Sequence, residues 1–121
     1  MATPYDYPDG PLAKRALAYT GDLALPPVPE GSNPVWHLYV VRTAEPLELA
    51  EHLREYGISC GHHYPIPLHL LPAYERLGYE RGRFPVTERL AAEAISLPIF
   101  PGIGEVRLEA VTEAIRDYFG G

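Results

Sequence analysis

The densest group of reactive side chains lies in residues 60–69, which hold Cys60, His62, His63, Tyr64 and His69. Imidazole and phenol groups hydrogen-bond to hydroxyl and phosphate oxygens, and imidazoles are also common zinc ligands. The segment contains no carboxylate and its spacing matches no zinc motif, so we expect no metal site. A Cys60 nucleophile with a histidine base has less support still, because neighbours in sequence need not meet in space. Taken alone, these residues favour a structural interpretation, in which one histidine packs and the others face solvent.

Two other motifs invite a chemical interpretation. Gly102-Ile103-Gly104 precedes an expected helix, but it lacks the third glycine of a nucleotide-binding loop and is more typical of a turn. Arg81-Gly82-Arg83 can attract an anion, although a pair of arginines at a glycine turn is more often a solvated surface.

Size and composition exclude several classes of protein. A chain of 121 residues suffices for one domain with a modest core. The net charge of -6 and the scattered basic residues argue against nucleic-acid binding. No apolar run approaches the roughly 20 residues that cross a bilayer, and the first residues do not resemble a secretory signal. We therefore expect no membrane insertion and a cytoplasmic location.

Prolines and glycines divide the chain into short elements. Residues 1–12 predict an extended or poorly ordered lead-in, and residues 13–121 a single domain. Apolar and β-branched runs predict strands at 36–42, 58–64 and 95–99, and helical periodicity predicts helices at 46–56, 85–94 and 105–119, with helical turns at 70–77. This order predicts an α+β fold, in which helices pack on one face of a small, mainly antiparallel sheet.

A series of motifs in this order resembles the C-terminal part of the DegT/DnrJ/EryC1/StrS aminotransferases. The motifs are WHLYVVR (36–42), HYPIPLH (63–69), PAY (72–74), LGY (77–79), GRFPVTE (82–88) and SLPIFP (96–101). The resemblance implies the C-terminal small domain of a fold-type I aminotransferase, whose full-length members use pyridoxal phosphate to aminate keto sugars, usually linked to a nucleotide. It also implies that His63 and Tyr64, with His69 as a third candidate, face the sugar or phosphate of the substrate.

The resemblance further implies what this chain does not provide. The family's Schiff-base lysine belongs to a large domain, and Lys14, the only lysine here, does not match it. We therefore expect no catalytic residue, no bound pyridoxal phosphate in this chain alone, and a partner in the form of a large domain or separate subunit. The chain would then be a split subunit, a truncated gene product or an excised piece, with a homo-oligomer as a further possibility. A stand-alone binding or assembly module, or a non-functional remnant of the fold, is the alternative.

Overall fold

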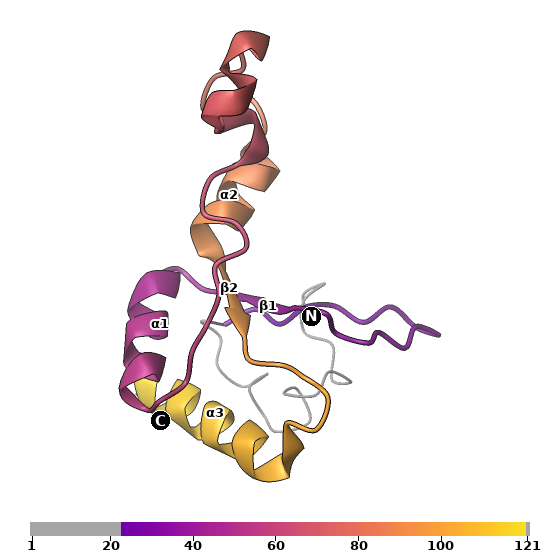
Figure 1. Cartoon of the computed structure of the whole chain (residues 1–121), viewed down its shortest axis with the longest axis vertical. Helices are drawn as coiled ribbons and strands as arrows, with labels where there is room; N and C mark the ends of the chain where they lie inside the picture. Colours follow the sequence, from indigo (N-terminus) through magenta and orange to yellow (C-terminus); the bar gives the residue numbers. More distant parts are fainter. Residues whose placement is uncertain (1–22, 121) are drawn as a thin grey trace.

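The computed structural model describes residues 23–120 (Figure 1). The elements follow the order β1 (Tyr39–Arg42), α1 (Pro46–Glu55), the 3-10 helices η3 (Leu68–Leu70) and η4 (Pro72–Leu77), α2 (Pro85–Glu93), β2 (Ala94–Leu97) and α3 (Gly104–Tyr118). The predicted lead-in at 1–12 lies outside the described residues. The predicted α+β fold is confirmed.

The sheet is antiparallel and consists of β1 and β2, with Tyr39 opposite Leu97 and Arg42 opposite Ala94. The strand predicted at 36–42 begins only at Tyr39, because Trp36 has a φ of 52° that interrupts extended backbone. Isolated bridges add Ala24 beside Arg42 and Gly61 beside Ser96.

The strand predicted at 58–64 is wrong, since only Gly61 pairs with the sheet. At its start, the Ile58 amide donates to the Leu53 carbonyl at the end of α1, so it is not available for a β-ladder. Gly57, with a φ of 76°, reverses the chain just before it. At the other end, Pro65 cannot donate a backbone hydrogen bond to a neighbouring strand.

The hydrophobic core lies where α1 and α3 pack together and against the sheet (Figure 1). Both helices place apolar residues at helical spacing on the buried side. The largest completely buried side chains are Tyr39 and Val41 of β1, Leu49 and Leu53 of α1, Ile115 of α3, and Leu25. Proline at the first position of α1 and α2 starts each helix at the predicted residue.

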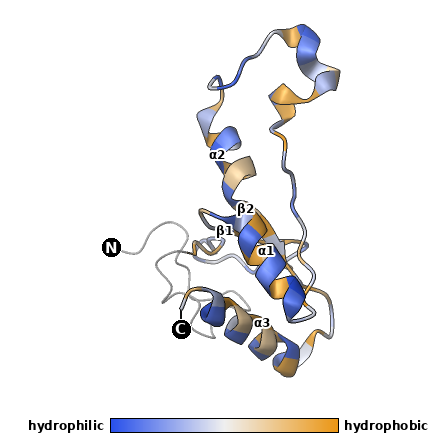
Figure 2. Ribbon diagram, turned by 90° about the vertical axis from the view of Figure 1, so that its left-hand side faces the viewer, coloured by the Kyte–Doolittle hydropathy of each residue, from blue (hydrophilic) through white to orange (hydrophobic). Residues whose placement is uncertain are grey.

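Residues 62–93, which we call the arm, rise away from this core (Figure 1). The arm carries η3, η4 and α2, and it returns directly into β2. A view turned by 90° shows the same projection, with apolar positions along the arm (Figure 2). Only His69 and Ala91 are buried within it. The helix predicted at 85–94, which forms as α2, therefore does not cover the sheet but extends beyond it (Figure 1).

Candidate functional site

His63 lies at the base of the arm and is held by the sheet. Gly61 and Ser96 exchange two backbone hydrogen bonds, of 3.0 Å from the Gly61 amide and 2.7 Å from the Ser96 amide. The Ser96 side chain is buried in β2, and its Oγ lies 2.8 Å from His63 Nδ1. The imidazole is thus anchored through one ring nitrogen, which leaves Nε2 as the nitrogen for another partner.

Gly61 makes room for this ring orientation. A Cβ on Gly61 would lie 2.5 Å from His63 Cε1, which is closer than side chains approach one another. The backbone at 61 does not need glycine for a left-handed conformation, because its φ lies outside that region. The requirement for glycine here comes from the imidazole.

Tyr64 adjoins His63 on the open side. Its side chain is 73% exposed, and the two rings meet edge-on with centroids 5.3 Å apart. Together they present an imidazole and a phenol to solvent. These groups donate to hydroxyl and phosphate oxygens, and the phenol ring can also pack against a sugar face.

Both residues border a groove of about 530 Å³, within the size range of small-molecule sites. One wall is the chain from His63 to Leu68 with Leu71, and the other is α2. The lining residues are Val40, His63, Tyr64, Pro65, Ile66, Pro67, Leu68, Leu71, Thr87, Leu90, Ala91 and Ala94. None carries a fixed charge, and the polar side chains are confined to His63, Tyr64 and Thr87. The groove is therefore apolar with one polar rim.

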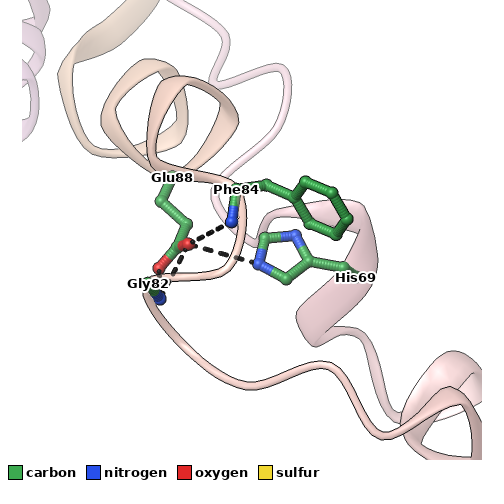
Figure 3. A network of polar contacts seen from close by, with 4 residues as sticks. All are labelled: His69, Gly82, Phe84 and Glu88. Carbon is green, nitrogen blue, oxygen red and sulfur yellow. Dashed lines mark hydrogen bonds and ion pairs between the residues drawn. The ribbon is translucent and has the colours of Figure 1, made fainter.

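The structure does not bring His69 to this rim. His69 is buried, its ring meets Phe84 edge-on at 4.9 Å, and Nε2 lies 3.4 Å from Glu88 Oε2 (Figure 3). The Glu88 carboxylate also accepts hydrogen bonds from the amides of Gly82, at 2.8 and 2.9 Å, and Phe84, at 3.2 Å. These contacts, led by the Gly82 amide, lower the pKa of the Glu88 carboxyl. His69 thus lies away from the rim formed by His63 and Tyr64, in a contact that joins η3 to α2.

The remaining candidates of the 60–69 segment have structural contacts. His62 Nε2 lies 2.8 Å from the Ala91 carbonyl and so ties the chain to α2. Burial raises the pKa of the Cys60 thiol to about 11, which opposes its use as a nucleophile at neutral pH. Within residues 23–120 no three histidine, cysteine or acidic side chains converge on a possible metal position.

Arg81 and Arg83 lie at the far end of the arm, beside a second hollow of about 460 Å³. The Arg83 guanidinium carbon lies 5.4 Å from the centroid of the Phe84 ring.

Among residues 23–120, no helix is long and apolar enough to span a membrane.

Sequence reasoning missed Ser96 and Glu88, which position two of the histidines. Ser96 is a hydroxyl residue inside the apolar run from Ala94 to Leu97, and that was an available signal. Glu88 follows Pro85 within the first turn of α2, where a carboxylate can accept amide hydrogen bonds from the preceding turn.

Comparison with known proteins gives consistent results. The profile of the DegT/DnrJ/EryC1/StrS aminotransferase family matches residues 11–116. A pleiotropic regulatory protein of Geobacillus stearothermophilus is 39% identical over 114 residues, which cover 88% of this chain and 31% of that protein. The dTDP-3-amino-3,4,6-trideoxy-alpha-D-glucose transaminase of Streptomyces venezuelae is 38% identical over 84% of this chain and 27% of its own length.

Solved structures agree with the sequence relatives. The crystal structure of Streptomyces venezuelae DesV in complex with a ketimine intermediate superposes with a TM-score of 0.82 at 37% identity, over 87% of this chain and 28% of that one. A family member from Brucella abortus gives a TM-score of 0.74 at 29% identity, over 83% and 27% of the two chains. This chain thus spans less than a third of the relatives it matches. From its motifs, its fold and these matches, the chain belongs to the DegT/DnrJ/EryC1/StrS aminotransferase family.

Proposed function

We propose that this chain is the C-terminal small domain of a pyridoxal-phosphate-dependent aminotransferase of nucleotide-linked sugars, and that it supplies contacts to the sugar side of the substrate. The observation that carries the proposal is the anchored His63 beside an exposed Tyr64 on the rim of a groove. The relatives named as transaminases of dTDP-linked amino sugars support the substrate class.

His63 and Tyr64 have different parts in this proposal. His63 is fixed through Nδ1 by Ser96, so Nε2 is the atom that hydrogen-bonds to a phosphate or hydroxyl oxygen. Tyr64 offers its hydroxyl to the same oxygens and its ring to the sugar. Both residues bind and orient the substrate, and neither moves a proton in the amino transfer.

The described residues do not fit pyridoxal phosphate itself. The cofactor chemistry of the family needs a lysine amine, and residues 23–120 contain no lysine. Lys14, the one lysine of the chain, lies outside the described residues. We therefore assign the cofactor and the amino transfer to a large domain, in the same polypeptide or in a separate subunit.

A chimera tests the proposal. Residues 13–121 replace the matching segment of the Streptomyces venezuelae transaminase, and the amino sugar in that enzyme's name serves as amino donor to 2-oxoglutarate. We expect the chimera to show the visible absorbance of bound pyridoxal phosphate and to transfer the amino group. A chimera that folds and binds the cofactor but transfers no amino group contradicts the proposed function.

A further inference from the structure

The far end of the arm carries two arginine side chains that the proposed function does not use. Arg81 and Arg83 are exposed and line the hollow of about 460 Å³, which shares no lining residue with the apolar groove. Neither guanidinium has a carboxylate partner among the described residues, whereas those of Arg42, Arg54 and Arg89 pair with glutamates. Two such cations at one hollow stand out on a chain of net charge -6 and attract anions.

The turn that carries both arginines is held in place. The Arg83 amide donates to the Glu80 carbonyl at 3.1 Å and closes the turn. Gly82, between the two arginines, has a φ of 96°, and its amide donates to the Glu88 carboxylate of α2 at 2.8 and 2.9 Å (Figure 3). The Glu88 side chain is only 14% exposed. The two guanidiniums therefore extend from a fixed backbone, which lowers the entropy lost when they bind one ligand together.

Aromatic and acidic side chains complete this end of the arm. Tyr79 meets Phe84 edge-on with centroids 5.0 Å apart, and the Arg83 guanidinium lies against the same Phe84 ring. Tyr79 also lines the hollow, and a phenol hydroxyl can donate to an anion. Glu80 is the acidic residue of the lining, so the wall has two cations against one carboxylate. The charged groups of the hollow thus sum to a net positive charge.

We propose that this hollow binds the phosphate or diphosphate group of a small molecule. A guanidinium donates two parallel hydrogen bonds to phosphate oxygens, and a phosphate group has enough oxygens to accept from two guanidiniums at once. A carboxylate has only two oxygens, which one bidentate guanidinium engages. The arginine pair therefore suits phosphate better. This site is separate from the rim at His63 and Tyr64 and stands independently of the proposed function.

Titration of the full chain with inorganic pyrophosphate, followed through its backbone amide resonances, tests the site. The resonances of residues 81–83 should shift with added pyrophosphate. Arg81→Gln and Arg83→Gln should each raise the dissociation constant at least about fivefold, because each removes one charged pair of donors. Glu80→Gln should lower the dissociation constant, because it removes the opposing carboxylate. The resonances outside the turn report whether each variant is folded.

Arg107→Gln on α3 is the matched control. Its guanidinium carbon also lies over a phenylalanine ring, 5.7 Å from the centroid of Phe100, and the substitution changes the net charge by the same amount. It should leave the dissociation constant for pyrophosphate unchanged. An equal loss of affinity in Arg107→Gln and Arg83→Gln would mean that net charge alone attracts the anion, and would overturn the proposal.

Two further probes identify the ligand. dTDP carries the same diphosphate group on a nucleoside: tighter binding of dTDP assigns the site to a nucleotide, and equal or tighter binding of pyrophosphate assigns it to a phosphate compound without a base. Either result supports a phosphate site. Citrate, a tricarboxylate of similar charge to pyrophosphate, should bind more weakly. Citrate binding as tight as that of pyrophosphate, or the absence of shifts at residues 81–83 with both phosphate probes, would overturn the proposal.

Discussion

Replacing Gly61 by alanine tests how His63 is positioned. The three heavy atoms nearest to the new Cβ all belong to the His63 ring, with Cε1 at 2.5 Å, Nδ1 at 3.1 Å and Nε2 at 3.4 Å. No other group stands in the way at less than the last of these distances. The imidazole must therefore move by about 1 Å to restore ordinary van der Waals separation, which takes Nδ1 out of hydrogen-bonding range or alignment with Ser96 Oγ.

The expected change in stability follows from two opposing effects. Loss of the hydrogen bond costs about 0.5–1.5 kcal/mol, and leaving the buried Ser96 hydroxyl without a partner adds to that cost. Alanine in place of glycine restricts the unfolded chain and returns about 0.4–1 kcal/mol. We expect Gly61→Ala to lower the free energy of unfolding by about 1 kcal/mol. In a His63→Ala background only the second effect remains, so the same change should be neutral or stabilising.

Urea denaturation of the four proteins of this cycle measures the coupling between Gly61 and His63. The reversal of sign between the two backgrounds is the signature of a steric contact with the imidazole. If Gly61→Ala destabilises both backgrounds equally, His63 does not lie over Gly61, and the anchored geometry of the candidate site is wrong.

Three further predictions concern the core, the thiol and the arm. Leu53→Ala should lower the free energy of unfolding by about 2–5 kcal/mol, because the Leu53 side chain is completely buried. Leu47→Ala, on the exposed side of α1, should lower it by less than about 0.5 kcal/mol. Thermal and urea denaturation measure this difference. Cys60, with a thiol pKa of about 11, should react with iodoacetamide about 100-fold more slowly at pH 8 than a peptide thiol of ordinary pKa 9, and the rate should keep rising up to about pH 11. The folded-state pKa of Glu88 is lowered, so the stabilisation from its hydrogen bonds to the Gly82 and Phe84 amides is fully present above the ordinary pKa of 4.5 and is lost as the pH falls through the lower folded value. The amide resonance of Gly82 should therefore titrate with a midpoint below 4.5. Glu88→Gln should abolish that titration.

Local signals in the sequence predicted most of the regular elements. Pro46 and Pro85 each begin a helix where expected, because proline suits the first turn, and the apolar period at Leu108, Val111 and Ile115 marks the buried side of α3. The predicted strand at 95–99 forms as Ala94–Leu97. Elements whose residues bury their own apolar side are the ones that pattern analysis predicts well.

The course of the arm could not be predicted in the same way. Its glycines and prolines predict turns, but almost none of its side chains are buried, so no periodicity indicates where it lies relative to the sheet. Ile58 does not join the sheet, because its amide donates a hydrogen bond to the Leu53 carbonyl at the end of α1. The strand-like composition of residues 58–64 does not reveal this contact.

The family resemblance, rather than the residues alone, selected His63 and Tyr64 as candidate site residues. His63 and Tyr64 do lie together on an accessible rim. The side chain that orients His63 is that of Ser96, 33 residues further along the chain. His69, in η3, contacts Glu88 of α2. Such pairings depend on tertiary structure, so spacing within residues 60–69 could not separate the exposed histidine from the buried one.

The Michaelis constant of the chimera for its nucleotide-linked sugar tests most directly whether this domain holds the sugar side of the substrate. His63→Ala and Tyr64→Phe should each raise KM by about 10-fold to 100-fold, the loss of one hydrogen bond to a charged phosphate oxygen, with a smaller change in kcat. Val106→Ala, on the exposed side of α3, should leave KM unchanged. An unchanged KM in both rim variants, with the protein folded and the cofactor bound, would contradict the account.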